Sequence, residues 1–202
     1  MMRLYAMSGS GNCYKPALLM QQLGIDFRWD EVDVVGGQTR RPEFLSRNPN
    51  GKVPLLEFDD GRTLAESNAM LCYLADGTPL FADDRWQRAQ ILQWLFFEQY
   101  SHEPYIATVR FWVKYLGKRD EWREKIAETM ARGHHALGVM ETQLRSTPFF
   151  AGETYTIADI ALYAYTHCAG DGGYRLDDYP RITQWLRRVE RQPRFVPMKD
   201  AP

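Results

Sequence analysis

The stretch that decides the fold reads Asn48-Pro49-Asn50-Gly51-Lys52-Val53-Pro54-Leu55-Leu56-Glu57-Phe58-Asp59-Asp60-Gly61-Arg62-Thr63-Leu64-Ala65-Glu66-Ser67-Asn68. Its first four residues are turn formers and predict a turn. Val53 and Pro54 then open an apolar run. Because a proline cannot donate to a sheet ladder, it belongs at the first residue or the edge of a strand. We therefore expect a turn followed by a short strand.

The second half of this stretch predicts a hairpin that leads into a helix. Asp59-Asp60-Gly61 is typical of a tight hairpin turn. Glu66-Ser67-Asn68 stands just before the apolar run 69–75, which has helical character. A helix N-terminus offers backbone N–H groups, and here it follows a strand whose entry is fixed by proline. Such an arrangement suits an anionic, peptide-like ligand.

The residues that precede this stretch predict a strand, a loop, a helix and a second strand. Residues 4–7 are apolar, 8–12 form a glycine-serine turn, and 14–23 show helical spacing. Residues 27–35 alternate as a strand does. Because a helix lies between the two strands, we expect them to be parallel. With a short helix at 42–45, the predicted order through residue 75 is β-α-β-α-β-β-α.

The rest of the chain changes character and predicts a second, all-helical domain. Strand alternation disappears after a Gly-, Pro- and Asp-containing segment, and long helical periods carry most of the tryptophans. A kink is expected at Pro104, because the apolar spacing resumes after it. The expected helical patterns are 86–112, 122–144, 156–168 and 182–190. We expect an α/β domain at 1–77, a linker at 78–85 and a helical domain at 86–202.

Composition and the few, widely spaced cysteines favour a soluble protein in the reducing cytoplasm. The chain has 202 residues and a formal net charge of -1, which gives no reason to expect nucleic acid or an acidic membrane surface as partner. The three cysteines and four histidines show no metal-ligand spacing, so we expect no metal. The first residues lack the pattern of a signal peptide, and no apolar run approaches the ~18 residues of a membrane span.

Four motifs together resemble the glutathione S-transferase family over nearly the whole chain. Ser8-Gly9-Ser10-Gly11-Asn12-Cys13 after Arg3-Leu4-Tyr5 resembles the active-site loop of its thioredoxin-like domain. Residues 48–54 resemble its cis-proline turn, Glu66-Ser67 is similar to its signature for the γ-glutamyl end of glutathione, and Thr156-Ile157-Ala158-Asp159 resembles its helical capping box. The resemblance implies a thioredoxin-like domain followed by an all-helical domain, glutathione as cosubstrate, a role in detoxification and a homodimer.

The resemblance assigns glutathione contacts to the opening stretch. A Val53-Pro54 bond can be cis at modest cost, and Val53 is then expected to hold the cysteinyl backbone of glutathione. Glu66 supplies an anion for the free amino group, and Ser67 serves both as helix cap and as contact. The expected glutathione-binding residues are Lys52, Val53, Pro54, Glu66, Ser67 and Gln38, with Lys52 and Gln38 expected at the glycyl carboxylate.

The resemblance also places the catalytic donor within the glycine-serine loop. A free thiol has a pKa of about 8.5, so only a small fraction of glutathione is thiolate at neutral pH. A hydroxyl donor and a helix N-terminus provide stabilisation of the right size to lower that pKa. We expect Ser10 to donate to the thiolate, with Asn12 as second choice and Ser8 as third. Cys13 is expected to be a packed residue of the helix and not a nucleophile.

The electrophile is expected to meet the helical domain. Candidate pocket residues there are Phe97, Tyr100, Tyr105 and Arg110. The leading interpretation is a transferase that adds the glutathione thiolate to an electrophilic small molecule. The alternatives are glutathione-dependent isomerisation, dehalogenation or peroxide reduction on the same fold, and a non-catalytic interaction or regulatory protein.

Overall fold

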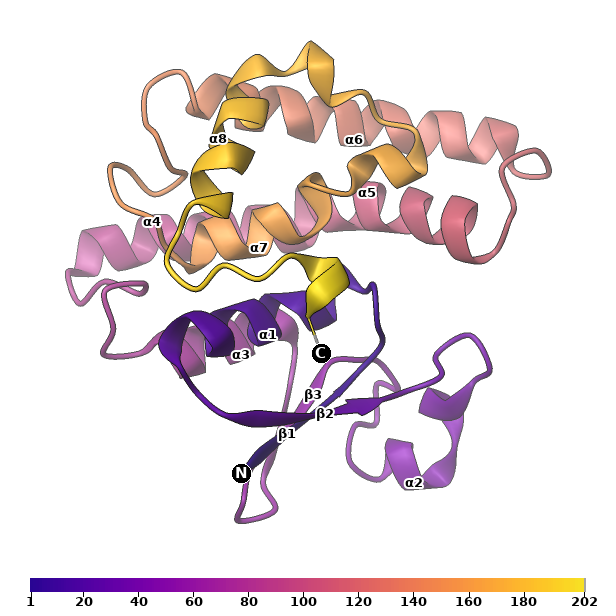
Figure 1. The fold of residues 1–202 in the computed structure, drawn as a ribbon. Coiled ribbons are helices and arrows are strands. Elements are labelled where there is room, and N and C mark those ends of the chain that lie inside the picture. The colour runs from indigo at the N-terminus through magenta and orange to yellow at the C-terminus, as the bar shows by residue number, and fades with distance from the viewer. Residues whose placement is uncertain (202) are drawn as a thin grey trace. The chain divides into compact units, whose positions relative to one another are not determined.

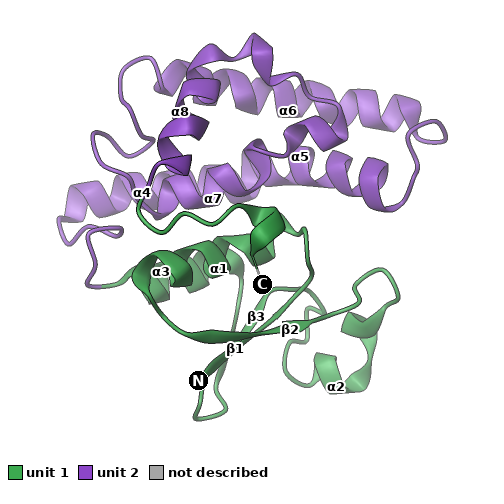
Figure 2. Ribbon diagram, in the orientation of Figure 1, with its two compact units in different colours: residues 1–76, 193–202 green, residues 77–192 purple. Residues whose placement is uncertain are grey.

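The computed structural model describes residues 1–201, which form two compact units (Figure 2). Among the described residues, unit 1 contains 1–76 together with 193–201, and unit 2 contains 77–192. Residues 193–201 group with unit 1, although they follow unit 2 in the sequence. The Tyr14 hydroxyl donates to the carbonyl of Val196 at 2.6 Å and helps to hold this segment. The segment has no apolar period that could have assigned it to either unit.

Unit 1 is built on a four-stranded sheet with the strand order β2-β1-β3-β4 (Figure 1). The strands are β1 (Met2–Ala6), β2 (Phe27–Glu31), β3 (Leu55–Glu57) and β4 (Thr63–Ala65). β1 and β2 are parallel, as expected for strands joined by a helix, and the other pairs are antiparallel. β2 is shorter than the expected strand 27–35. The Asp33 carboxylate accepts from the Gly36 N–H at 2.7 Å, and this local turn bends the backbone away from the extended conformation.

The helices of unit 1 cover both faces of the sheet. α1 (Gly11–Leu23) and α3 (Ser67–Ala75) lie together on one face, and the 3₁₀ turn η1 (Gln38–Arg40) and α2 (Pro42–Leu45) lie at the other (Figure 1). Gly24 ends α1 in the left-handed region at φ 68°, where a glycine is unstrained. On the α2 face, the buried side chains of Tyr5, Val32, Phe44 and Leu55 form a small apolar cluster.

Unit 2 is helical. Its α-helices are α4 (Arg85–Phe97), α5 (Glu103–Arg110), α6 (Arg123–Gln143), α7 (Ile157–Thr166) and α8 (Pro180–Glu190). Two π-helical turns, η2 (Glu98–His102) and η3 (Phe111–Tyr115), flank α5. Pro104 lies in the first turn of α5, directly after η2, and its missing N–H leaves one acceptor of the continuous helix α4–η2–α5 without its usual donor. The expected interruption at Pro104 is therefore a π-helical turn. No helix within residues 1–201 combines the length and the apolar character needed to cross a membrane.

The expected capping box at the start of α7 is confirmed. The Thr156 hydroxyl accepts from the Ala158 N–H at 3.3 Å, and Asp159 Oδ2 accepts from the Thr156 N–H at 2.9 Å. Asp159 is fully buried, and its Oδ1 also accepts from the Phe150 N–H at 3.1 Å and from the Trp185 indole at 2.9 Å. The box therefore joins α7 to α8 and to the loop before it. The fold class expected from the sequence, a thioredoxin-like domain followed by an all-helical domain, is confirmed.

Candidate functional site

Ser10 lies at the junction of the glycine-serine loop and α1. It is the N-cap residue of α1 with extended backbone angles, and its Oγ accepts from the Cys13 N–H at 3.4 Å. An accepting hydroxyl keeps its own proton for donation to a second group. Ser8 is different, because its hydroxyl donates to Glu31 at 2.7 Å and its N–H donates to the same carboxylate at 2.8 Å. Of the two hydroxyls, that of Ser8 is the one already bonded to a carboxylate.

The N-terminal turns of α1 and α3 are joined by side-chain hydrogen bonds. The Ser67 hydroxyl donates to Asn12 Oδ1 at 3.3 Å. The Lys15 ammonium donates to Ser67 Oγ at 3.3 Å and to Asn68 Oδ1 at 3.4 Å. The bond from Ser67 fixes the Asn12 amide with its oxygen toward Ser67. The bonds bring two motifs that are far apart in the sequence to one corner of unit 1.

Lys15 is a residue of this corner that the sequence analysis missed. Its side chain is fully buried in α1. A buried lysine requires partners that satisfy its ammonium group, and two of them belong to the Ser67-Asn68 motif. The signal in the sequence was a single charged residue within the otherwise apolar helical run that follows Asn12.

Glu66 has an unusual backbone conformation just before α3. Its φ of 67° and ψ of 111° place a non-glycine residue in the left-handed half of the map. Such a conformation costs of order 1–3 kcal/mol and concentrates at functional sites. The expected helix cap by Ser67 is wrong, because Ser67 is the first residue of α3 and Glu66 holds the N-cap position without a side-chain cap bond. The Glu66 side chain is exposed, so its carboxylate is presented to solvent beside the buried Ser67.

The turn before β3 is held by Asn48. Its Nδ2 donates to the carbonyl of Lys52 at 2.8 Å, and its Oδ1 accepts from the Asn50 N–H at 3.1 Å. The Val53-Pro54 bond is cis, as expected. Lys52 is exposed, and the Val53 side chain packs against the apolar cluster around Tyr5. This turn fixes the backbone that enters β3.

Gln38 and Cys13 take no part in the hydrogen bonds that join the N-terminal turns of α1 and α3. Gln38 Oε1 accepts from the Asp33 N–H at 2.8 Å, and the side chain lines a pocket on the α2 face of the sheet. Cys13 is fully buried, and its sulfur accepts from the Met7 N–H at 3.3 Å. Burial raises the pKa of the Cys13 thiol to about 11, although the hydrogen bonds of Ser10 and Met7 act against this shift. Cys13 therefore stays a neutral thiol at physiological pH.

Within unit 2, the four expected electrophile-pocket residues face different neighbours. Phe97 lines a pocket of about 680 Å³ that also includes residues of α6. Tyr100 is 82% exposed. Tyr105 lies 5.8 Å from the Arg132 guanidinium, measured to the ring centroid, and Arg110 is buried with its Nε 2.9 Å from Asp171. Arg110 thus has an ion-pair partner inside the helical unit.

Comparisons with known proteins agree with both units. The family model "Glutathione S-transferase, N-terminal domain" matches residues 9–76, and "Glutathione S-transferase, C-terminal domain" matches residues 90–193. The disulfide-bond oxidoreductase YfcG of Escherichia coli is 30% identical, over 90% of this chain and 87% of its own.

Two solved structures share the whole fold. A crystal structure of glutathione S-transferase from Pseudomonas fluorescens has a TM-score of 0.97 and 52% identity, and covers 98% of this chain and 99% of its own. A glutathione transferase family member from the same species, solved with two glutathione bound, has a TM-score of 0.85 and 27% identity, and covers 100% of this chain and 93% of its own. Both are similar to this chain along its length.

Proposed function

Because the chain belongs to the glutathione S-transferase family, we propose that it binds glutathione in unit 1, ionises the thiol and adds the thiolate to an electrophilic small molecule. The observation that carries the proposal is the hydrogen bond from Ser67 to Asn12. It places the motif proposed to hold the γ-glutamyl end beside the loop proposed to hold the sulfur. A tripeptide that bridges the two motifs has its thiol at the start of α1.

Each proposed binding residue contacts a different part of glutathione. Val53 and Pro54 present backbone to the cysteinyl part, Glu66 offers a carboxylate to the free amino group, and Ser67 offers its backbone N–H at the α3 N-terminus to the γ-glutamyl carboxylate. The exposed Lys52 supplies charge for the glycyl carboxylate. Gln38 stays a weaker candidate for that carboxylate, because its Oε1 is bonded to the Asp33 N–H.

Ser10 and Asn12 act on the sulfur. Lowering the pKa of a thiol by about two units means favouring the thiolate by about 2.7 kcal/mol. One charge-assisted hydrogen bond contributes roughly 1.5–3 kcal/mol, and the N-terminus of α1 adds a favourable dipole. Ser10 retains its hydroxyl proton for this bond, and Asn12 is the second candidate donor. The thiolate then forms a C–S bond to the electrophilic carbon, the leaving group departs with the electron pair of its own bond to that carbon, and the proton that the thiol released goes to solvent.

The test is a pH titration of the thiolate absorbance of bound glutathione, together with conjugation of a chromogenic aryl halide. We expect Ser10→Ala to raise the thiol pKa and to lower conjugation at least tenfold. Ser8→Ala removes a hydroxyl that is bonded to Glu31, and we expect the thiol pKa to stay as in the wild type. A raised pKa in Asn12→Ala but not in Ser10→Ala moves the main role to Asn12. An unchanged pKa in both variants contradicts the proposal.

For the electrophile, we propose contacts from the aromatic residues Phe97, Tyr100 and Tyr105. Arg110 is not included, since its guanidinium is paired with Asp171. The proposal further includes a homodimer, a cytoplasmic location and a role in detoxification, all of which rest on the family. Light scattering of the purified protein tests the dimer, and a screen of electrophile classes against each alanine variant tests the aromatic contacts.

A second candidate function is reduction of a disulfide bond by two glutathione molecules. It is favoured by the similarity to a disulfide-bond oxidoreductase and to a structure with two glutathione bound. In this reaction two glutathione thiols are oxidised to glutathione disulfide, and the substrate disulfide takes up the two electrons and two protons. The protein needs no thiol of its own, which agrees with the buried, protonated Cys13. Reduction of a small disulfide should be unchanged in Cys13→Ala, and its loss would contradict this chemistry.

A further inference from the structure

Lys15 is a buried cation to which the proposed reaction assigns no role. It lies in the second turn of α1, and its side chain is 0% exposed. Burying a charge costs free energy unless the surrounding groups satisfy it. A lysine is therefore an expensive way to fill this place in α1, and what its ammonium group does for the neighbouring residues needs an explanation.

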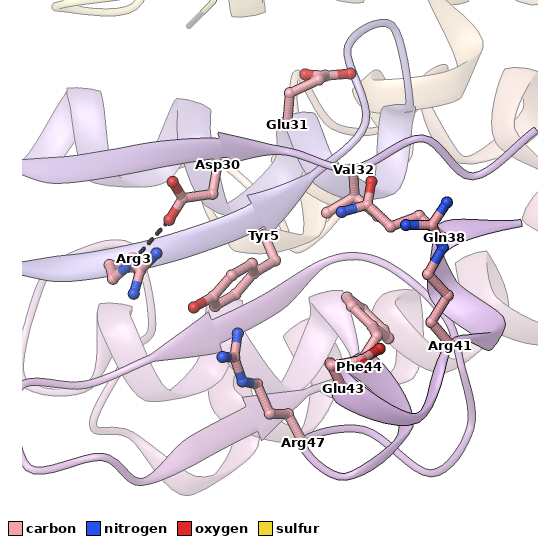
Figure 3. A pocket seen from close by; sticks show the side chains of 10 residues that line it. All are labelled: Arg3, Tyr5, Asp30, Glu31, Val32, Gln38, Arg41, Glu43, Phe44 and Arg47. Atoms are coloured by element: carbon pink, nitrogen blue, oxygen red, sulfur yellow. Dashed lines mark hydrogen bonds and ion pairs between the residues drawn. The ribbon is translucent and has the colours of Figure 1, made fainter. Parts of the chain in front are cut away.

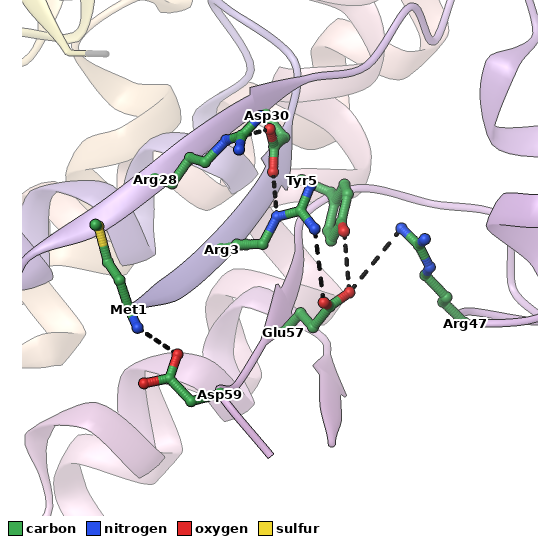
Figure 4. A network of polar contacts seen from close by, with 8 residues as sticks. All are labelled: Met1, Arg3, Tyr5, Arg28, Asp30, Arg47, Glu57 and Asp59. Carbon is green, nitrogen blue, oxygen red and sulfur yellow. Dashed lines mark hydrogen bonds and ion pairs between the residues drawn. The ribbon is translucent and has the colours of Figure 1, made fainter. Parts of the chain in front are cut away.

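The arginines on the α2 face of the sheet are held in another way. Arg3 donates to Asp30 at 2.8 Å, and the Arg47 guanidinium lies 3.9 Å from Glu57 (Figure 4). These cations face carboxylates at a partly exposed surface, as surface ion pairs usually do. The Lys15 ammonium instead donates to a hydroxyl and to an amide oxygen. Both acceptors are neutral, so these two bonds leave its positive charge in place.

The direction of the hydrogen bonds that start at Lys15 is fixed by chemistry. An ammonium group has donors and no acceptor, so Ser67 Oγ accepts from it, at 3.3 Å. The Ser67 hydroxyl proton then points to Asn12, at 3.3 Å, where the amide has to offer its oxygen. Lys15 therefore decides which end of the Asn12 amide faces Ser67.

Without the ammonium, Ser67 and Asn12 could bond with either polarity. A hydroxyl accepts as readily as it donates, so the amide could rotate by half a turn and give its NH₂ group to Ser67. The amide oxygen would then take the place of the NH₂ group. An N–H that faces a thiolate stabilises the negative charge, whereas a carbonyl oxygen in the same place repels it.

The glycine-serine loop experiences charges of both signs. The Ser8 hydroxyl donates to Glu31 at 2.7 Å, and Figure 3 shows the Glu31 side chain apart from the arginines of the α2 face. Burial is the main reason that the pKa of the Cys13 thiol is raised, and of the nearby charges Glu31 raises this pKa while Lys15 lowers it. The positive charge of Lys15 therefore reaches a sulfur in the first turn of α1, against the opposite influence of Glu31.

We propose that Lys15 is a positioning residue for the thiolate: it acts through Ser67 and fixes the Asn12 amide as a donor toward the sulfur. The inference rests on the proposed function, because it takes the glutathione thiol to be ionised at the start of α1. In a chain of hydrogen bonds each donor strengthens the next, so a charged first member makes the last N–H a stronger donor. Lys15 does this without touching glutathione.

This role is compatible with the contact proposed between Ser67 and glutathione. The γ-glutamyl carboxylate takes the backbone N–H of Ser67 at the N-terminus of α3. The hydrogen bonds to Lys15 and Asn12 use its hydroxyl. One residue thus serves both ends of the peptide's dipeptide unit, with two different groups.

The experiment is a pH titration of the thiolate absorbance of the full-length protein saturated with glutathione. Lys15→Met removes the charge and keeps the length of the side chain, and Ser67→Ala removes the hydroxyl and keeps the backbone N–H. We expect each substitution to raise the pKa of the bound thiol by at least about 0.5. The acidic limb of the kcat/KM profile, with an aryl halide as the varied substrate, should move by the same amount.

Arg62→Gln is the control for overall charge. Arg62 lies in the same unit, and its side chain is exposed. Its replacement removes one positive charge, as Lys15→Met does, and should leave the pKa of the bound thiol at the wild-type value. A shift in Arg62→Gln equal to that in Lys15→Met overturns the proposal, because the effect then follows net charge.

A double-mutant cycle tests the route through Asn12. In the Asn12→Ala background, Lys15→Met should raise the thiol pKa by less than half as much as in the wild type, because the group through which it acts is gone. An equal shift in both backgrounds overturns the proposal, since Lys15 then acts by its charge alone. A wild-type thiol pKa in Lys15→Met or in Ser67→Ala overturns it as well.

The wild-type titration separates this inference from the proposed function. If bound glutathione keeps the thiol pKa of free glutathione, the proposed function fails and the inference fails with it. If the wild type lowers that pKa and the variants match the wild type, the inference alone is refuted. Melting temperatures are measured alongside. Should Lys15→Met unfold, Ser67→Ala and its cycle with Asn12→Ala decide.

Discussion

The backbone of Glu66 provides the sharpest test of the proposed glutathione site. Glu66 sits at φ 67° immediately before α3, and its side chain is exposed. A conformation of this kind costs of order 1–3 kcal/mol for a residue with a Cβ. Glycine adopts it without strain, but glycine also gains about 0.4–1 kcal/mol of conformational freedom in the unfolded chain. The net effect of Glu66→Gly is an expected increase of about 1 kcal/mol in the free energy of unfolding.

This gain is measurable. For a chain of this size, about 1 kcal/mol corresponds to a rise of roughly 2–4 °C in melting temperature. The same substitution removes the carboxylate proposed to meet the amino group of glutathione, a bond of roughly 1.5–3 kcal/mol. Glutathione affinity should therefore fall at least tenfold. The matched variant is Glu66→Gln, which keeps the side chain and the strain but loses the charge.

The two variants separate the backbone from the carboxylate. Calorimetry without ligand should give a higher melting temperature for Glu66→Gly and a wild-type value for Glu66→Gln. Titration with glutathione should show weaker binding in both. A lower melting temperature in Glu66→Gly would refute the argument that the backbone is strained. Wild-type affinity in both variants would refute the contact with the amino group, whatever the melting temperatures are.

Two further substitutions test the corner and the core. Lys15→Met removes the ammonium that donates to Ser67 and Asn68. We expect glutathione affinity to fall about five- to tenfold, because Ser67 loses its fixed orientation. Titration calorimetry measures this loss, and wild-type affinity would contradict it. Asp159→Asn leaves some of the donors from Phe150, Thr156 and Trp185 without an acceptor. Urea unfolding should therefore show a free energy of unfolding lower by about 2–4 kcal/mol. A decrease below about 1 kcal/mol would contradict this account.

Features that depend on a few neighbouring residues were predictable from the sequence. The short helix at Pro42–Leu45, the hairpin turn at Asp59–Gly61 and the Thr156 capping box each rest on bonds within about four residues. The early end of β2 was not predicted, because apolar alternation continues through Val34 while the Asp33 side chain turns the backbone. The π-helical turns beside α5 were also missed, since the apolar period of an α-helix runs through them.

The candidate site was predictable in its motifs but not in its connections. Resemblance alone named Ser10, Asn12, Glu66 and Ser67, and it ranked Ser8 third without a physical reason. The structure shows that the Ser8 hydroxyl donates to Glu31, and the ranking itself stays a prediction. Lys15 could not be placed from the sequence, since a lysine in a helix is usually solvated and its burial depends on how α3 packs against α1.

Two unusual features of unit 1 meet at the start of α3. Glu66 has a strained backbone, and Lys15 is a fully buried cation within bonding distance of Ser67. Each could be removed by one substitution, a glycine at position 66 or an apolar side chain at position 15. Stability alone gives no reason to keep either, and still less to keep both beside Asn12. A ligand that needs a carboxylate, an oriented hydroxyl and an oriented amide in one place gives a reason for both, and it accounts for their position as well as for their presence.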